Sequence, residues 1–374
     1  MLYGGAAAEP APLVARIIEK KAADFNGRNR VVPRGAMHAT RGNERNSVLR
    51  NVRGLAVVEE GKSTDDQWQQ GADYRDGTLT TRTRQERAMP IDVDKLLSYP
   101  IPTVRQRLSR QDAAFYALSV GMGQDPADPR QLPYVDFTKE MTVLPSMALV
   151  LAHPGFWLGD PRSGVDPTQV VHGEQALTLH HALPVDTDLV SETTIEEVVD
   201  KGVGQAALLY TRKTLKDADS GLLIASTLNT TFIRGGGGFG GTGAQPKASL
   251  TMPEGEPDYV VDLPTRPEQA LYYRLNGDHN PLHADPEVAA KAGFARPILH
   301  GLCTLGMVCH ALVRSLCDYR ASHLREMSLR FAAPVYPGET LRCEIWRDGS
   351  FRAWVVERDV LVIAQGRCIA GTAG

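Results

Sequence analysis

Cysteine is scarce in this sequence of 374 residues, and its placement excludes several kinds of chemistry. The five cysteines are odd in number, contain no CxxC pair and lie in the last quarter of the chain: Cys303, Cys309, Cys317, Cys343 and Cys368. A disulfide framework requires an even set, and a thiolate zinc site requires closely spaced pairs. We therefore expect free thiols, which suit a reducing compartment.

Long hydrophobic runs and a strong net charge are missing as well. The run at 147–158, MALVLAHPGFWL, is much shorter than the roughly 20 apolar residues that span a bilayer. A formal net charge of -3 gives no electrostatic reason to expect nucleic acid. The first residues lack the pattern of a secretory signal, and the last four, GTAG, are not a peroxisomal address. We expect a soluble, cytoplasmic protein with no nucleic-acid or membrane partner.

Composition divides the chain into four parts. Residues 1–88 are rich in arginine and show no sustained hydrophobic period, which predicts a disordered extension, with Met89 as a plausible natural start. Regular periodicity follows, and we assign 89–234 to a first domain. The glycine-rich segment that begins GGGGFGG predicts a flexible linker over 235–257. A second domain covers 258–374.

Both domains combine helical and strand-like patterns. Apolar residues recur at helical spacing in 110–123 and most strongly in 299–317, LHGLCTLGMVCHALVRSLC. Strand-like runs separated by turn-forming residues follow in each domain. The stretch 176–195 also resembles 327–346, with a Pro-Val pair closing a strand in both. We predict an α+β protein formed by duplication, each half with one long helix and one antiparallel sheet.

A dense polar cluster occurs in the second half and has no counterpart in the first. The segment 276–293, NGDHNPLHADPEVAAKAG, places Asp278 and His283 five residues apart, on either side of an Asn-Pro kink. Turn chemistry explains part of this pattern, and His283 would then be an ordinary core histidine. The kink, however, also lets both side chains converge on one point. Together with the helix start at Gly301, they would supply acid–base chemistry beside a developing oxyanion.

The cluster and its surroundings resemble a known signature. YRLNGDHNPLHADPEVA at 273–289, followed by ARPILHGLCTLG at 295–306, is similar to the motif of the (R)-specific enoyl-CoA hydratases, the hydratase 2 or MaoC-like dehydratase family. The sequence departs from it at Asn276, where the family prefers Ser, Thr, Gly or Cys. The resemblance is to the two-domain members, including the hydratase part of peroxisomal multifunctional enzyme type 2. It implies a double hot-dog fold, in which each half wraps a long helix in a curved antiparallel sheet.

The resemblance also implies a reaction and its residues. Family members add water reversibly to trans-2-enoyl-CoA, form the (3R)-3-hydroxyacyl-CoA and need neither a metal nor another cofactor. Four residues match the catalytic positions: Asp278 and His283, which hold and deprotonate the water, Asn280 in support, and Gly301, whose N–H binds the thioester oxygen. Four more match substrate-contacting positions: His172, Gly173, Lys201 and Phe331. Family habit further suggests a homodimer and, in the first half, room for a long or branched acyl chain.

Other interpretations of the same residues stay open. Lys201, which precedes a glycine, is more often an ordinary turn lysine, and Phe331 on an alternating strand is more often a core residue. A dehydratase working in the reverse direction on a specialised or carrier-bound thioester would have the same site. A non-catalytic acyl-thioester-binding protein or a hot-dog thioesterase would share the fold. A thioesterase releases free CoA, whereas hydration does not.

Overall fold

The computed structural model describes residues 90–240 and 251–371, all of which lie in one compact unit, Gln70–Gly374. The predictions for residues 1–88 fall outside the described residues. Among the helices that the structure describes, none is both long and apolar enough to cross a membrane.

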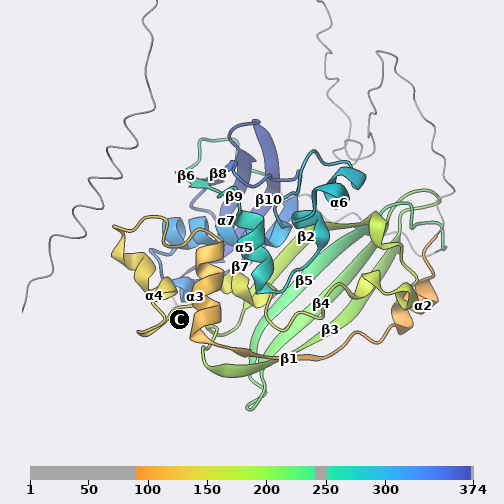
Figure 1. The fold of residues 1–374 in the computed structure, drawn as a ribbon, viewed down its shortest axis with the longest axis horizontal. Coiled ribbons are helices and arrows are strands. Elements are labelled where there is room, and N and C mark those ends of the chain that lie inside the picture. Colours follow the sequence, from red (N-terminus) through yellow and green to blue (C-terminus); the bar gives the residue numbers. More distant parts are fainter. Residues whose placement is uncertain (1–89, 241–250, 372–374) are drawn as a thin grey trace, which may run out of the picture. The chain divides into compact units, whose positions relative to one another are not determined.

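Ten strands pair antiparallel into one sheet, in the order β1-β3-β4-β5-β2-β7-β10-β9-β8-β6 (Figure 1). The first half contributes β1 (Val104–Leu108), β2 (Val170–Leu179), β3 (Thr187–Asp200), β4 (Ala207–Asp217) and β5 (Leu223–Ile233). The second half contributes β6 (Tyr259–Pro264), β7 (Leu324–Phe331), β8 (Thr340–Ile345), β9 (Ser350–Val355) and β10 (Val360–Ala370).

The strand order confirms the duplication. In each half, the order from the outer edge inwards is first, third, fourth, fifth and second strand, and the two halves meet at their second strands. There β2 pairs with β7, from Glu174 opposite Arg330 to Thr178 opposite Glu326. Because these two strands are neighbours, residues from different halves that are far apart in sequence lie side by side.

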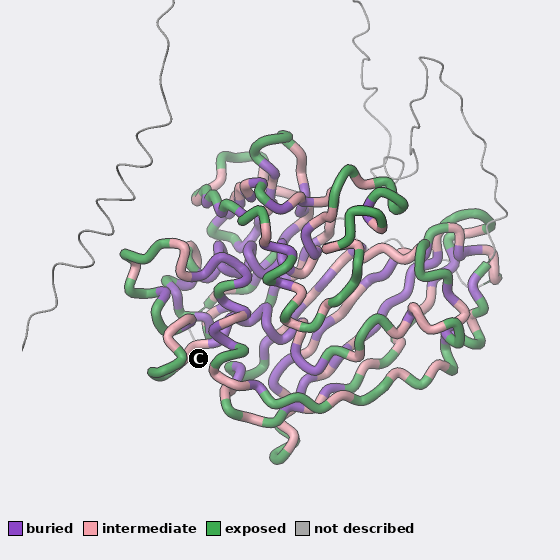
Figure 2. Tube along the Cα trace, viewed as in Figure 1, coloured by how far each residue is buried: buried purple, intermediate pink, exposed green. Residues whose placement is uncertain are grey.

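Helices from both halves contribute to the core. Helix α7 (Gly301–Leu316) lies within the predicted range 299–317, and residues 303–313 are all buried (Figure 2). Helix α3 (Arg110–Ser119) belongs to the first half and begins with a capping box between Ser109 and Asp112. The shorter helices are α2 (Val93–Ser98), α4 (Leu132–Val135), α5 (Gln269–Tyr273) and α6 (Pro286–Lys291).

The two halves differ in the length of their longest helix. Whereas α7 has 16 residues, α3 has 10. The apolar segment before β2 forms only short 3-10 turns, η3 (Pro145–Leu149) and η4 (Trp157–Gly159). Regular helix does not continue there, because Ala152 has a φ of 47° and Pro154 follows. Two further 3-10 turns, η7 (Arg274–Asn276) and η8 (Pro281–His283), lie in the polar segment.

The glycine-rich segment differs from the flexible linker that its composition predicts, at least over 235–240. Asp200 Oδ1 accepts the N–H groups of Gly202 and Gly238, both at 2.7 Å, and its Oδ2 accepts the N–H of Gly240 at 2.8 Å. A Cβ on Gly237 would lie 2.5 Å from the Gly202 carbonyl oxygen. These glycines therefore allow the chain to pack closely onto the β3–β4 loop rather than making it flexible.

Candidate active site

The polar segment forms two tight turns between α5 and α6. The first, η7, ends at Gly277, whose φ of 111° is readily adopted by glycine alone. The second, η8, begins at Asn280, whose side-chain oxygen accepts the N–H of Leu282 at 3.0 Å. The segment therefore forms the turns that its sequence predicts. These turns place Asp278 just before η8 and His283 at its end.

Asn276, where the sequence departs from the family signature, joins this segment to the first half. Its Nδ2 donates to Ser119 Oγ on α3 and to the Tyr273 carbonyl, both at 2.9 Å. The buried side chain of Gln269 also donates to the carbonyl of Ser119. The amide of Asn276 thus does not disturb the turn; it ties the turn to α3.

His283 is held in one tautomer by the backbone. Its Nδ1 lies 2.9 Å from the carbonyl oxygen of Ile298. A carbonyl only accepts, so Nδ1 carries the proton and Nε2 keeps a lone pair. Burial lowers the pKa of His283 from 6.5, although the Ile298 carbonyl and the charge of Asp278 partly oppose this. The ring is therefore neutral at neutral pH.

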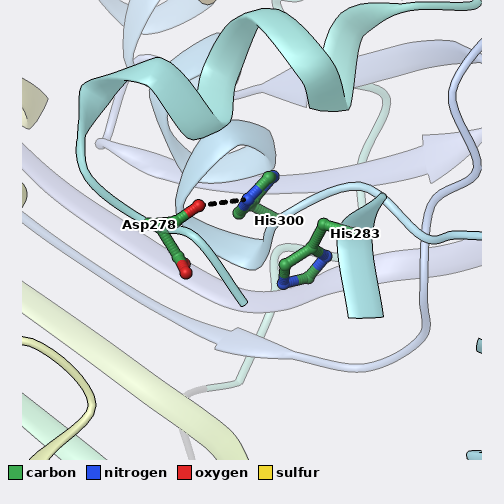
Figure 3. Close-up of side chains that lie close together, drawn as sticks. All are labelled: Asp278, His283 and His300. Atoms are coloured by element: carbon green, nitrogen blue, oxygen red, sulfur yellow. Dashed lines mark hydrogen bonds between the residues drawn. The ribbon is translucent and has the colours of Figure 1, made fainter. Parts of the chain in front are cut away.

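His300 completes the site and was not predicted as one of its residues. Its ring stacks on that of His283, with centroids 3.8 Å apart and planes inclined by 27°. Its Nε2 lies 3.2 Å from the Asp278 backbone carbonyl, to which it donates (Figure 3). Burial and the neighbouring His283 lower the pKa of His300. The sequence shows this histidine directly before Gly301, but not that it contacts both catalytic candidates.

Asp278 lies beside the two rings. Its Oδ1 accepts the Asn280 N–H at 3.2 Å. Ligand atoms of Asp278, His283 and His300 lie within 4.8 Å of one another, as in a possible cation site. The stacking disfavours that use, because the lone pairs of two nearly parallel rings lie in separate planes and do not converge on one ion. The geometry suits a water molecule better, held by the carboxylate and deprotonated by an imidazole.

Gly301 provides a backbone donor at the start of α7. Its N–H precedes the first hydrogen bonds of the helix and lies at the positive end of the helix dipole. Phe331 on β7 covers this position, since a Cβ on Gly301 would lie 3.3 Å from the ring. Phe331 in turn meets His172 on β2 edge-on, with centroids 4.8 Å apart. Two predicted substrate contacts from different halves are thus brought together beside Gly301.

Both parts of the chain match known families. Residues 107–235 match the MFE-2 hydratase 2 N-terminal domain, and residues 249–365 match the MaoC like domain. Enoyl-CoA hydratase ChsH3 of Mycobacterium tuberculosis is 41% identical over 268 residues, which cover 70% of this chain and 91% of that protein. The chain belongs to the enoyl-CoA hydratase 2 family of MaoC-like dehydratases.

Further comparisons agree with this family. The peroxisomal enoyl-CoA hydratase 2 of Arabidopsis thaliana is 36% identical over 295 residues, covering 72% of this chain and 93% of that protein. The crystal structure of a MaoC-like dehydratase from Phytophthora capsici is 28% identical, with a TM-score of 0.66, and covers 75% of this chain and 98% of that one. The predicted double hot-dog fold and the predicted enzyme class, a hydro-lyase, are confirmed.

The other two predicted substrate contacts of this hydratase, Gly173 and Lys201, are not among the residues gathered around Gly301. Gly173 sits under the ring of Phe232, which a Cβ would approach to 2.2 Å, so packing within the sheet already requires glycine there. Lys201 is exposed in the β3–β4 loop, and β3 lies three strands from β2. At about 4.8 Å per strand, that is roughly 14 Å across the sheet. Their contacts with the substrate stay predictions.

One histidine of the first half, His153, has a shifted pKa although no motif indicates it. His153 is exposed, but desolvation by the protein around its ring lowers its pKa, an effect that Lys213 strengthens and the charge of Asp278 partly opposes. The charge of Asp278 acts in the same direction on His172, whose pKa burial lowers to about 4. In the sequence His153 is only part of an apolar segment interrupted by Pro154.

Proposed function

We propose that this hydratase adds water reversibly to trans-2-enoyl-CoA, with Asp278 and His283 as its catalytic pair. One observation carries the proposal: the bond from Nδ1 of His283 to the Ile298 carbonyl leaves Nε2 as a base next to a carboxylate. The product is (3R)-3-hydroxyacyl-CoA, a configuration that rests on the family resemblance. The acyl-CoA is the substrate, and its hydration needs no metal or other cofactor.

The first step forms the bond between oxygen and C3. Asp278 accepts a hydrogen bond from the water and holds the molecule in place. Nε2 of His283 removes the other proton while the water oxygen attacks C3, which is electrophilic because it is conjugated to the thioester carbonyl. The electron pair of the C2–C3 double bond moves toward the carbonyl. The result is an enolate and a protonated His283.

Stabilisation of the enolate falls to Gly301. Negative charge develops on the thioester oxygen, and the N–H of Gly301 donates to it at the positive end of the α7 dipole. One such donor typically stabilises a transition state by about 3–4 kcal/mol. Asn280 supports the pair through the turn that its side chain caps, which holds Asp278 and His283 in place.

The second step returns the proton. His283 transfers the proton from Nε2 to C2, the electron pair of the enolate forms the new C–H bond, and the base is neutral again. Read backwards, the same steps remove water from a 3-hydroxyacyl thioester. A dehydratase for a specialised or carrier-bound thioester is therefore the second candidate. It is favoured by a relative 39% identical over 272 residues, 3-hydroxyacyl-thioester dehydratase Y of Mycobacterium tuberculosis.

A test of the reaction uses the full chain with trans-2-decenoyl-CoA. We expect the enoyl-thioester absorbance to fall, chiral analysis to show the (3R) product, and DTNB to detect no more thiol than with the enzyme alone. Release of free CoA would identify a thioesterase instead. If the absorbance stays constant with short, medium, branched and carrier-bound enoyl thioesters, the protein binds acyl thioesters without hydrating them.

Two properties complete the proposal. We infer a homodimer, the habit of the family, and expect light scattering to give the mass of two chains. A monomer at micromolar concentration would contradict this. We also infer that the enzyme works in the cytoplasm, where five free and buried cysteines would stay reduced. Fractionation that finds it in another compartment would overturn that inference.

A further inference from the structure

Ser119 is the last residue of α3, in the half that lacks the Asp–His pair, and 3% of its surface is exposed. Side chains from three elements of the other half bind it. Nδ2 of Asn276 on η7 donates to its Oγ at 2.9 Å. Its carbonyl oxygen accepts from Nε2 of Gln269 on α5 and, at 3.6 Å, from Sγ of Cys303 on α7. None of these four residues takes part in the proposed water chemistry.

The position of Ser119 at the end of a helix makes these bonds possible. The last carbonyl groups of an α-helix have no partner within the helix, so the carbonyl of Ser119 can accept from other elements. Its hydroxyl has one hydrogen, which goes to the Tyr116 carbonyl at 2.7 Å. The lone pairs of Oγ therefore remain for the amide of Asn276. The end of α3 is thus joined to the second half by donors that the second half supplies.

Asn276 connects this serine to the catalytic turn. Both hydrogens of its amide are used, because Nδ2 also donates to the Tyr273 carbonyl at 2.9 Å. Gly277 follows with a φ of 111°, and a Cβ added there would meet nothing within 4 Å, so packing does not hold the chain at that point. Asp278 comes next. The bond from Asn276 to Ser119 therefore fixes the chain on the N-terminal side of Asp278.

The same serine is joined to the start of α7. Cys303, whose thiol contacts the Ser119 carbonyl, lies in the first turn of that helix, and its N–H donates to the His300 carbonyl at 3.0 Å. The ring of His300 donates in turn to the Asp278 carbonyl. Gly301 lies between His300 and Cys303 in the chain. Ser119 is therefore a junction between the turn that carries Asp278 and the helix start that carries Gly301.

The separation of Asp278 and Gly301 matters for the proposed reaction. Asp278 holds the water that attacks C3, whereas the N–H of Gly301 binds the thioester oxygen of the same conjugated, planar group. A displacement of about 1 Å at a reacting group can cost about 100-fold in rate. A residue that fixes this separation is expected to control kcat more than the binding of the acyl-CoA.

We propose that Ser119 is a positioning residue for the hydration, which acts through Asn276 to hold Asp278 at a fixed distance from Gly301. This inference rests on the proposed function. It gives the half without the catalytic motif a part in the chemistry. It also gives a reason for asparagine at 276, the position where the sequence departs from the family signature.

Kinetics of the full chain with trans-2-decenoyl-CoA test the pair. Ser119→Ala removes the acceptor, and the hydroxyl of Asn276→Ser ends one bond short of Nδ2 and does not reach Ser119. We expect each variant to lower kcat about tenfold and to leave KM within about twofold of wild type. The double variant should lie within about twofold of the lower single variant, because both changes remove the same bond. Losses that multiply in the double variant would contradict the proposal.

Gln124→Ala is the matched control. Gln124 lies shortly after α3 and also binds across the halves, with Nε2 donating to the Pro264 carbonyl at 3.1 Å, but Pro264 belongs to β6 and not to the catalytic turn. Its kcat should equal that of wild type. A role of Ser119 in stability alone would lower the Tm of Ser119→Ala and leave its kcat at the wild-type value, and that result would overturn the proposal. If Ser119→Ala does not fold, Asn276→Ser takes its place in this comparison.

Hydrogen exchange followed by mass spectrometry separates this inference from the reaction itself. Ser119→Ala should speed exchange in the segment 277–283 about tenfold, the effect of losing one hydrogen bond, and Gln124→Ala should not. Unchanged exchange in Ser119→Ala would overturn the positioning role. A wild type that hydrates no enoyl thioester would defeat the proposed function, while the exchange rates would still decide whether Ser119 holds the turn.

Discussion

The imidazole rings of His283 and His300 stack with their centroids 3.8 Å apart. Each ring has one polar atom fixed by a backbone carbonyl, of Ile298 for His283 and of Asp278 for His300. Two charges at this separation would repel strongly, so each ring favours the neutral form of the other. The stacked rings therefore favour the neutral form of His283, and His300 links this ring to the backbone of Asp278.

Removal of the His300 donor should slow the reaction without unfolding the protein. His300→Phe keeps a stacked ring but cannot donate to the Asp278 carbonyl. Small displacements of a catalytic group cost up to about 100-fold, so we expect kcat/KM to fall between about 10- and 100-fold. His300→Gln, which retains a side-chain donor, should fall less. Wild-type kcat/KM in His300→Phe, with the fold checked by circular dichroism, would show that the contact is unimportant.

Activity should depend on pH through the neutral form of His283. Burial lowers its folded-state pKa from 6.5, so the fraction in the basic form rises with pH through that lowered value. We expect log kcat/KM to be flat near neutrality and to decline only below pH 6.5. Initial rates at saturating and limiting substrate between pH 4.5 and 8 measure this. An acid limb with its midpoint above 6.5 would contradict the assignment of His283 as a neutral, buried base.

Stability should fall in acid because burial disfavours the charged form of His310. It lies on α7 with 2% of its surface exposed, and burial lowers its pKa to about 4. The unfolded chain binds this proton near pH 6.5 and the folded chain only near pH 4, so this contribution to stability is complete above pH 6.5 and is lost as the pH falls from 6.5 to about 4. One such histidine removes about 1 kcal/mol between pH 6.5 and 5.5.

Urea unfolding of His310→Leu at these two pH values tests this expectation. The variant should lose less stability between them than wild type, while the other buried histidines still contribute. An identical pH dependence in the variant and the wild type would mean that His310 takes up its proton in the folded state.

A methyl group at Gly173 should destabilise the sheet. Its Cβ would lie 2.2 Å from the ring of Phe232, which must then move. Overpacking of this kind costs about 1–3 kcal/mol, measured as a lower Tm of Gly173→Ala. Phe232→Leu in the same chain should restore part of the loss. Gly255→Ala, where the added Cβ meets nothing within 4 Å, is the control. Equal Tm values for both glycine variants would refute the packing role.

The sequence predicted those elements that depend on residues close together in the chain, and it missed others. Helix α7 and the catalytic motif were predictable because their periodicity and turn residues act within a few positions. The edge strands β1 and β6 were not predicted: β1, VRQRL, has polar residues at three of five positions and a single buried one, Leu108. Strands at a sheet edge often carry charged side chains, so they lack a clear alternation of apolar and polar residues.

The active site shows the same limit. Asp278 and His283 are five residues apart and could be paired by inspection. His300 depends on a contact across 22 positions from Asp278, which only the packing of α7 creates. A buried lysine such as Lys213 carries no sequence signal, because its stem and charge look like those of an exposed strand residue.

The central claim, that Asp278 and His283 carry the water chemistry, is tested most directly by kcat/KM for hydration of trans-2-decenoyl-CoA. Asp278→Asn and His283→Ala are compared with wild type and with His279→Ala, an exposed histidine of the same segment. We predict losses of about 100-fold or more in both catalytic variants, each folded as wild type, and little change in His279→Ala. Hydration by His283→Ala or Asp278→Asn at the wild-type rate would contradict the account.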